Sequence, residues 1–226
     1  MKSNIKVINL GFVNAFLVKL KDGFALIDTG VPNSWNALEE KLISEGCKPD
    51  KLKIVILTHG DMDHVGNAKK LQDKYKAKIL IHKKDFEDLK KGVHTKRFVR
   101  PLGFRIMFTI IFALYQLRRK FKKADEHKDL FKPIFVSDGE SLAKYGFNAK
   151  IIHIPGHSKG SIGILTKDKI FFAGDTFVNR KKPETAQIIE NDKELKDSIE
   201  KIKRLDIKTI YPGHGTPFSY NSMYKQ

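Results

Sequence analysis

Short apolar runs recur along the chain, and most of them end at a turn that contains Gly or Asp. Runs of three to eight residues with β-branched and aliphatic side chains are too short for helices and predict buried strands. The expected strands cover residues 6–10, 13–20, 24–27, 54–57, 78–81, 133–136, 149–154, 162–165, 170–173 and 209–211.

Helical spacing fills the intervals between several of these strands. In residues 34–45, Trp35, Leu38 and Leu42 share one face, and Gly46 follows as a stop. The other predicted helices cover residues 67–75, 85–91, 104–121 and 191–204, the last opened by a capping box at Asn191 and Glu194. Strands followed by helices in both halves predict one α/β domain over residues 1–226, with a helical insertion at about 92–132.

The composition fits a water-soluble protein of one large domain, with 226 residues and 41% hydrophobic positions. The single cysteine, Cys47, excludes an internal disulfide and is typical of a reducing compartment. The first ten residues lack the apolar core of a signal peptide, and no run reaches the length of a spanning helix. We therefore expect a cytoplasmic protein.

The positive charge is concentrated in the insertion. Residues 90–124 hold eleven lysines and arginines and no acidic residue, in a chain of net charge +17. Between the basic flanks, residues 106–117 are almost entirely apolar. This segment predicts a lid over the active site, a peripheral contact with an anionic membrane, or a homodimer contact. A solvated face without a partner is the alternative, and the Phe-rich core disfavours nucleic acid.

Residues suited to metal binding follow the predicted strands. The densest cluster lies after residues 54–57, where two imidazoles and two carboxylates occur within six positions: His59, Asp61, Asp63 and His64. His157, Asp175 and His214 each lie beside a glycine after a later strand, and Asp28 ends the strand at 24–27. Ligand-type residues at the ends of several strands indicate one site along one edge of a layered sheet structure.

This set of motifs resembles the metallo-β-lactamase superfamily of metallohydrolases. The resemblance covers about residues 5–92 and 133–218 and rests on five motifs in order, at Asp28, the His59–His64 cluster, His157, Asp175 and His214. It implies an αββα sandwich, in which two mixed sheets pack face to face with helices outside. One position departs: the family usually has H-x-H-x-D-H, and Asp61 replaces the second histidine here.

The resemblance also implies a dinuclear metal centre. His59, Asp61 and His157 would hold the first metal, Asp63, His64 and His214 the second, and Asp175 would bridge the two. We expect two divalent ions, zinc first, with iron or manganese as alternatives because carboxylates suit harder metals. A bridging hydroxide would be the nucleophile. Asp63 and Asp175 are the expected catalytic residues, and Asp28 would support the segment from His59 to His64 (the metal loop) without binding metal. His82 is interpreted as a structural residue or as one that supports a ligand, and a role as a ligand itself is disfavoured.

The substrate is less determined than the site. The resemblance implies a small molecule with an ester, thioester, lactone or phosphodiester bond, and the basic insertion favours an anionic or lipid-like one. β-Lactams are disfavoured because zinc β-lactamases usually have Cys at the position of Asp175. Lys159 and Arg105 are candidate substrate-binding residues. Two alternatives stay open: a di-iron oxidoreductase, because the di-iron relatives carry a carboxylate at the position of Asp61, and a nucleic-acid phosphodiesterase.

Overall fold

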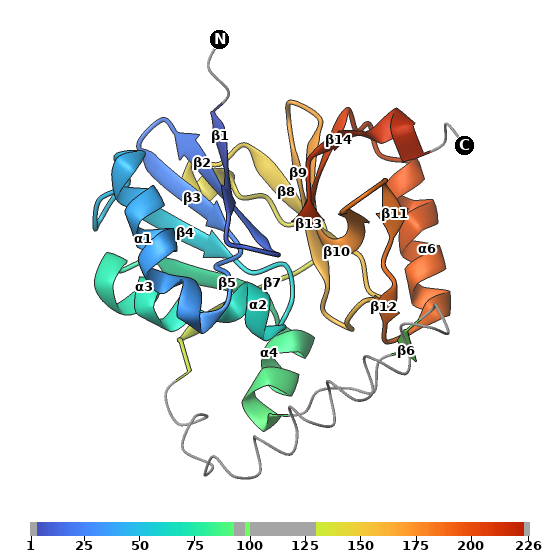
Figure 1. Cartoon of the computed structure of the whole chain (residues 1–226), viewed down its shortest axis with the longest axis horizontal. Coiled ribbons are helices and arrows are strands. Elements are labelled where there is room, and N and C mark those ends of the chain that lie inside the picture. The colour runs from blue at the N-terminus through green and yellow to red at the C-terminus, as the bar shows by residue number, and fades with distance from the viewer. Residues whose placement is uncertain (1–3, 93–97, 100–129, 224–226) are drawn as a thin grey trace.

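The structure, a computed structural model, describes residues 4–92, 98–99 and 130–223 (Figure 1). The predicted helix at 104–121, Arg105 and most of the basic segment at 90–124 lie outside the described residues. The expected lid, membrane contact and dimer contact of this insertion therefore stay predictions.

The first sheet has the strand order β1-β2-β3-β4-β5-β7. Its first three strands pair antiparallel and the remaining pairs are parallel, so the sheet is mixed. The strands are β1 (Ile5–Asn9), β2 (Asn14–Leu20), β3 (Gly23–Ile27), β4 (Leu52–Ile56), β5 (Lys78–His82) and β7 (Pro133–Val136).

The second sheet has the order β14-β13-β10-β9-β8, with β11 added beside β10. Only the β10 and β13 pair is parallel within that order. The strands are β8 (Ala149–His153), β9 (Ile162–Thr166), β10 (Ile170–Asn179), β11 (Glu184–Thr185), β13 (Thr209–Gly215) and β14 (Phe218–Ser219). A separate short pair joins β6 (Phe98–Val99) to β12 (Ile188–Ile189).

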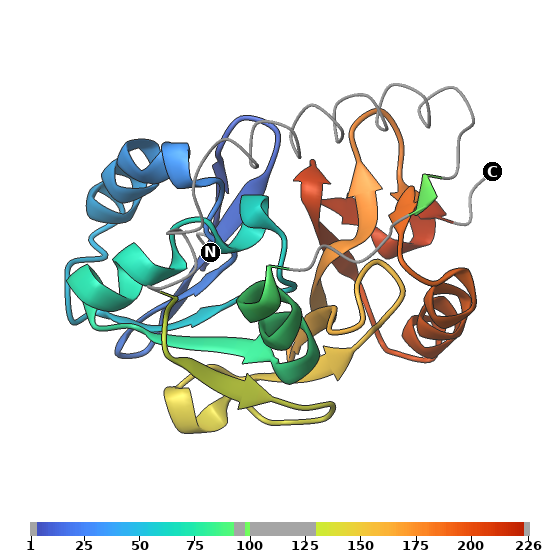
Figure 2. The ribbon, with the colours of Figure 1, turned by 90° about the horizontal axis from the view of Figure 1, so that it is seen from below.

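Helices flank the two sheets in the views of Figures 1 and 2. The α-helices are α1 (Trp35–Ser44), α2 (Met62–Val65), α3 (Ala68–Tyr75), α4 (Lys83–Lys91) and α6 (Asp192–Lys203). The described part of the chain also contains three short 3-10 turns: η1 (Pro32–Ser34), η2 (Ala143–Tyr145) and η3 (Tyr220–Met223). Asn191 caps α6 by accepting hydrogen bonds from the N–H groups of Lys193 and Glu194.

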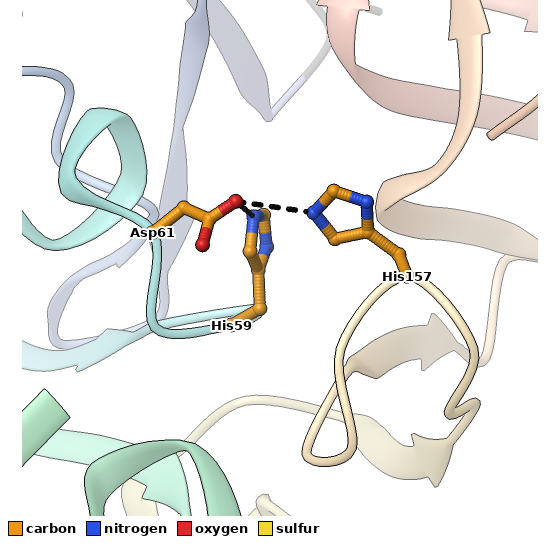
Figure 3. A group of neighbouring side chains, drawn as sticks. All are labelled: His59, Asp61 and His157. Atoms are coloured by element: carbon orange, nitrogen blue, oxygen red, sulfur yellow. Dashed lines mark hydrogen bonds and ion pairs between the residues drawn. The ribbon is translucent and has the colours of Figure 1, made fainter. Parts of the chain in front are cut away.

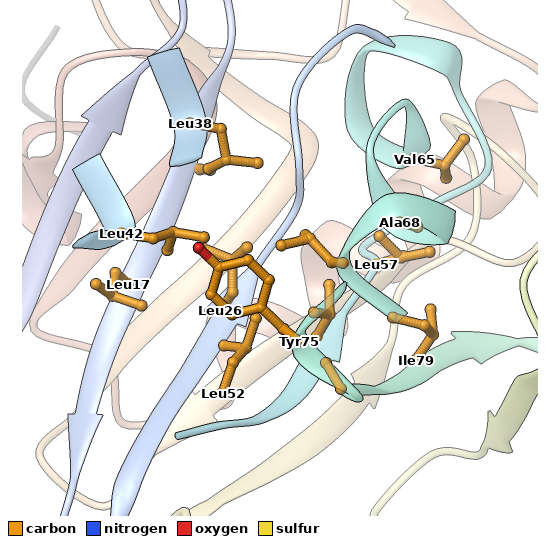
Figure 4. Packing of buried hydrophobic residues seen from close by; sticks show 14 of the residues in the cluster. Leu17, Leu26, Leu38, Leu42, Leu52, Leu57, Val65, Ala68, Tyr75 and Ile79 are labelled. Atoms are coloured by element: carbon orange, nitrogen blue, oxygen red, sulfur yellow. The ribbon is translucent and has the colours of Figure 1, made fainter. Parts of the chain in front are cut away.

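The alternation of side chains along the strands produces three apolar layers. On the outer face of the first sheet, Leu26 and Leu57 pack with Leu38 of α1 and Tyr75 of α3 (Figure 4). Between the sheets, residues of the opposite alternation meet, for example Phe16 and Ile54 with Phe172. On the outer face of the second sheet, residues such as Phe171 and Ile210 pack with Ile202 of α6.

These layers confirm the predicted αββα sandwich of two mixed sheets. The expected ends of two strands were wrong. β10 and β13 continue past the glycines that predicted turns, through Asp175 and His214, because register shifts at Phe172/Gly174 and Gly174/Val178 absorb the irregular backbone. The segment from His59 to His64 is also not entirely a loop, since Asp63 and His64 lie on the short helix α2.

Among the described residues, no helix is both long enough and apolar enough to span a bilayer.

Candidate metal centre

The candidate site lies where segments of both sheets converge. The first sheet supplies the segment after β4, in which His59 and Asp61 precede α2 and its residues Asp63 and His64. The second sheet supplies His157, from the loop after β8, together with Asp175 in β10 and His214 in β13. Asp175 and His214 come from neighbouring strands, because β10 and β13 pair with each other and Val178 of β10 lies opposite His214.

The structure brings all seven expected ligand residues together. Three groups of three residues have ligand atoms that all lie within 4.8 Å of one another: His59, Asp61 and His157; Asp63, His64 and His214; and His59, His64 and Asp175. The first two groups have the same members as the two sets that the resemblance implied. The third takes one histidine from each set, so Asp175 lies between them.

Asp61 is close to both histidines of the first group. Its Oδ2 atom lies 3.4 Å from His59 Nε2 and 3.2 Å from His157 Nε2 (Figure 3). The carboxylate thus occupies a position from which it can share a cation with these two imidazoles. A histidine at position 61 would offer a neutral nitrogen instead, so Asp61 makes this half of the site more negative.

Asp175 reaches histidines of both sets. Its Oδ1 lies 3.3 Å from His64 Nε2, and its Oδ2 lies 3.1 Å from His214 Nε2 and 3.9 Å from His157 Nε2. Asp63 Oδ2 is 3.5 Å from His214 Nε2 and 3.8 Å from His64 Nε2. Each set therefore combines two imidazoles with one carboxylate and shares Asp175.

The four histidines are oriented alike. Each directs Nε2 into the site, and its Nδ1 lies within hydrogen-bond distance of an oxygen outside the site. When Nδ1 donates its hydrogen to an oxygen, the neutral ring keeps a lone pair on Nε2, which is the form that binds metal. The partners of Nδ1 are the Asp28 carboxylate for His64 (2.8 Å), the Thr58 hydroxyl for His59 (3.0 Å), the Ile188 carbonyl for His157 (2.7 Å) and the Phe12 carbonyl for His214 (2.5 Å).

The inward atoms fit a bound cation. His59 Nε2, His64 Nε2 and Asp175 Oδ1 are buried and have no hydrogen-bond partner. Buried polar atoms without a partner are costly, and they are rare unless water or an ion satisfies them. Imidazole nitrogens and carboxylate oxygens in this mixture are donors that zinc, iron and manganese all accept.

Asp28 supports the site from behind, with its side chain fully buried. Its Oδ1 accepts a hydrogen bond from the Thr58 N–H, and its Oδ2 accepts from the Thr58 hydroxyl and from His64 Nδ1, each at 2.8 Å. Thr58 in turn contacts His59. One carboxylate thus holds both the start of the segment from His59 to His64 and the Nδ1 atom of His64, and Asp28 belongs to none of the three groups of ligand atoms.

Gly213 allows the close approach of β13 to the site. A Cβ atom at this position would overlap Asp175 Oδ1 and would come within 2.8 Å of His64 Cε1. Any side chain at position 213 would therefore displace donors from both sheets.

The donors perturb one another's protonation in the metal-free chain. Burial by itself lowers the pKa of His64, but Asp28, Asp175 and Asp63 outweigh it and raise that pKa well above its usual value. For His214, burial is likewise outweighed, chiefly by Asp175, and its pKa is raised. Burial favours a higher pKa for Asp175, yet His214 and His64 hold that pKa well below its usual value.

These shifts predict opposite pH dependences for the metal-free and metal-loaded chain. His64 and His214 have raised pKa values when folded, so the stability that they contribute is present below about pH 6.5 and is lost as pH rises through the raised values. Asp175 has a lowered pKa, so its contribution is present above about pH 3.8 and is lost as pH falls further. Metal requires neutral imidazole, so its affinity should rise with pH.

Urea unfolding between about pH 6 and pH 9, with chelator or with excess Zn²⁺, measures both effects. We expect the metal-free unfolding free energy to fall across this range and the stabilisation by zinc to grow. A metal-free stability that rises with pH would contradict the assigned shifts. His64→Gln, which removes one titrating group, should flatten the metal-free slope.

Other predicted residues are placed outside the donor cluster. Lys159 pairs with Glu190 at 3.0 Å and lies 3.9 Å from Asp88. His82 stacks on His153, with ring centroids 4.3 Å apart, and caps α4 by accepting from the Lys84 N–H. Arg105 lies outside the described residues. The substrate-binding roles of Lys159 and Arg105 stay predictions, and the structural interpretation of His82 agrees with its contacts.

Sequence reasoning missed several supports of the site. Thr58 links Asp28 to His59, and Asn14 holds the segment around His214 by donating to the carbonyls of Pro212 (3.1 Å) and Gly215 (2.7 Å). The carbonyls of Phe12 and Ile188 are backbone acceptors, which every residue type carries, so no sequence signal could have identified them.

Comparison with known proteins places these features in a family. A model of the metallo-beta-lactamase superfamily matches residues 8–214. A probable metallo-hydrolase of Methanocaldococcus jannaschii is 27% identical over 224 residues, which cover 93% of this chain and 94% of that protein. A beta-lactamase-like protein 2 homolog of Caenorhabditis elegans is 27% identical over 206 residues, 89% of this chain but 55% of the worm protein.

A solved structure has the same fold. A metallo-beta-lactamase family protein of Thermus thermophilus superposes with a TM-score of 0.68 at 22% identity, over 96% of this chain and 75% of that one.

Proposed function

The chain belongs to the metallo-β-lactamase superfamily, and from that membership we propose that it is a hydrolase with two divalent metal ions. The observation that supports this most is the convergence of seven ligand-type side chains, with groups of three ligand atoms within 4.8 Å of one another. The buried Nε2 atoms of His59 and His64 have no hydrogen-bond partner and belong to the same group of neighbouring ligand atoms.

In this proposal the two sets of donors divide the work. His59, Asp61 and His157 would hold one ion and Asp63, His64 and His214 the other. Asp175, which lies near histidines of both sets, would contribute to both sites. Ions bound there would lower the pKa of a water that they share and polarise the oxygen of the bond to be cleaved. The oxygens that contact Nδ1 would orient the donor histidines, and Asp63 and Asp175 would keep negative charge beside that water.

Zinc is the metal that we propose first, with iron and manganese as alternatives. Asp61 gives the first set the same donors as the second, two imidazoles and one carboxylate. The two sets should therefore have the same preference between harder and softer metal ions. Three carboxylates among the donors also favour harder ions more than the usual two do. A di-iron oxidoreductase is the functional alternative that this composition keeps open.

Metal analysis of protein purified without added metal tests the proposal, together with a screen of thioester, lactone and phosphodiester chromogenic substrates. We expect two ions for each chain and hydrolysis of at least one substrate class. Asp61→His should retain two ions and shift the preference towards zinc, because it replaces a hard oxygen by nitrogen. Absence of bound metal under all loading conditions would refute the proposal, and dominant iron with oxygen consumption would favour the oxidoreductase.

We also propose that the substrate is anionic or lipid-like and that the basic insertion contacts an anionic membrane. The support is sequence alone: an apolar stretch at 106–117 between basic flanks within residues 90–124. Each lysine or arginine near such a surface contributes about 1 kcal/mol before screening by salt. Such a segment is too short to cross a bilayer but long enough to lie along it.

Sedimentation with anionic and neutral vesicles measures this contact. We expect the full chain to bind anionic vesicles at low salt and to lose binding when residues 95–124 are replaced by a short Gly/Ser loop. A matched control keeps the apolar stretch and replaces only Arg118, Arg119 and Lys120 by Gln, which should weaken binding without abolishing it. Equal sedimentation of all three chains would remove the membrane role. A change of oligomeric state on loop replacement would instead support the homodimer contact.

A further inference from the structure

Asp85 lies in the first turn of α4, outside the seven ligand-type residues, and its carboxylate is buried against the segments that carry His59, Asp61 and His157. The residue is only 4% exposed. Helix α4 follows β5 and packs beside β5 and β7, which places its first turn next to the segment after β4.

The Asp85 carboxylate joins two segments that are distant in sequence. Its Oδ2 accepts hydrogen bonds from the Gly60 N–H at 2.8 Å and from the Ser158 hydroxyl at 2.7 Å. Its Oδ1 accepts from the Gly160 N–H at 2.6 Å. Hydrogen bonds to an ionised acceptor are about twice as strong as neutral ones, so this is a firm connection between the two segments.

The partners of Asp85 adjoin one set of donors. Gly60 lies between His59 and Asp61, and Ser158 follows His157 directly. The neighbours of Gly60 and Ser158, namely His59, Asp61 and His157, form the first group of donors. Within it, Asp61 and His157 are 96 positions apart in the chain. The second group is supported by other contacts, with Asp28 on His64 and the Phe12 carbonyl on His214.

The packing around Asp85 leaves little room for the two segments to shift. A Cβ atom on Gly160 would lie 2.5 Å from Asp85 Oδ1 and 2.8 Å from its backbone nitrogen. A Cβ atom on Gly60 would lie 3.1 Å from the Asp85 carbonyl oxygen. Ser158 is held further by Ser161, whose hydroxyl lies 2.7 Å from that of Ser158.

We propose that Asp85 is the positioning residue of the first metal set: it fixes the distance between the His59–Asp61 segment and the His157 loop. This inference rests on the proposed metal centre and adds to it. Loss of the Asp85 bridge should weaken the first ion selectively, because ligands must be held to within a few tenths of an ångström. The second ion should keep its affinity.

Titration of Zn²⁺ into the metal-free full chain, against a competing chelator, tests this. Asparagine at position 85 would offer one acceptor oxygen to the three donors that converge there. With Asp85→Asn we therefore expect one of the two zinc ions to bind at least about tenfold more weakly. Ser158→Ala removes one of the three donors and should weaken the same equivalent less. Asp88→Asn is the matched control, since it changes an acid of the same helix that lies 3.9 Å from Lys159.

Double variants assign the weakened ion. With His157→Ala the first set is already broken, so adding Asp85→Asn should change zinc binding little. With His214→Ala the first set remains, and Asp85→Asn should weaken it by the full factor. Equal weakening of both ions would overturn the inference, as would unchanged affinities with a lower thermal midpoint of the metal-free chain, the result for a merely structural residue.

The wild-type titration separates this inference from the proposed function. A wild-type chain that binds no zinc, manganese or iron overturns both. Two bound ions that are insensitive to Asp85→Asn overturn only the positioning role.

Discussion

Asp175→Ala is expected to remove both metal ions and nearly all hydrolytic activity. Asp175 is the donor that reaches both sets, at 3.3 Å from His64 Nε2, 3.1 Å from His214 Nε2 and 3.9 Å from His157 Nε2. Loss of a supporting contact of a metal ligand costs about 10- to 100-fold. Loss of a shared ligand with its charge should exceed that range for both affinity and kcat/KM.

The measurements are metal content after dialysis and the rate on whichever substrate the wild-type enzyme cleaves. Asp168→Ala is the matched control, because Asp168 lies in the exposed turn of the same β9–β10 hairpin and should leave both unchanged. Thermal unfolding of the metal-free variant checks that the fold persists. Retention of two ions and a wild-type rate by Asp175→Ala would show that the donors do not form one shared site.

Asp28→Asn is expected to have the next largest effect, although Asp28 is not one of the seven ligand-type residues. The carboxylate accepts from Thr58 and from His64 Nδ1, which leaves a lone pair on His64 Nε2. An amide nitrogen in place of Oδ2 would donate to Nδ1 and move the ring hydrogen to Nε2. That tautomer cannot bind metal, so we expect a loss of about 10- to 100-fold in affinity and rate.

Asparagine is the suitable replacement because Asp28 has a φ of 57°, a conformation that Asn tolerates better than Ala does. The larger affinity loss should fall on the ion that His64 binds, with a smaller one on the ion of His59, because Thr58 connects Asp28 to His59. Zinc titration of the metal-free chain detects this as two unequally weakened equivalents. Asp22→Asn, in the exposed β2–β3 turn, is the control. If Asp28→Asn kept both affinities while Asp175→Ala lost them, His64 orientation would not depend on this hydrogen bond.

Strand and helix positions were largely predictable because the spacing of apolar residues along the chain shows which side chains are buried. Residues 54–57 read as a buried strand, and β4 covers Leu52–Ile56 with Leu57 also buried. The errors lie at β10 and β13, where Gly174, Gly213 and Gly215 indicated turns. Pairing between the two strands kept them extended, with register shifts, through Asp175 and His214. Local propensity cannot anticipate that, because the partner strand is distant in the chain.

The members of the site were predictable for a different reason. Histidine and aspartate beside glycine at several strand ends form an ordered set that chance seldom produces, and all seven lie together in the structure. Supports other than Asp28 were not predictable, since two of the three partners of Asp85 and the partner of His214 Nδ1 are backbone groups that any sequence supplies.

The sequence by itself determined the positions of most strands and helices, because burial periodicity is a local property of the chain. The αββα sandwich and the grouping of the seven ligand-type residues followed from the resemblance of the ordered motifs to a known family. Only the tertiary structure decided how these residues are held: which nitrogen of each histidine faces inward, that Asp175 lies between the two sets, and that Asp85 joins loops from opposite sheets. Those relations depend on contacts between segments up to 202 positions apart, such as Phe12 with His214, and folding alone brings such segments within hydrogen-bond distance.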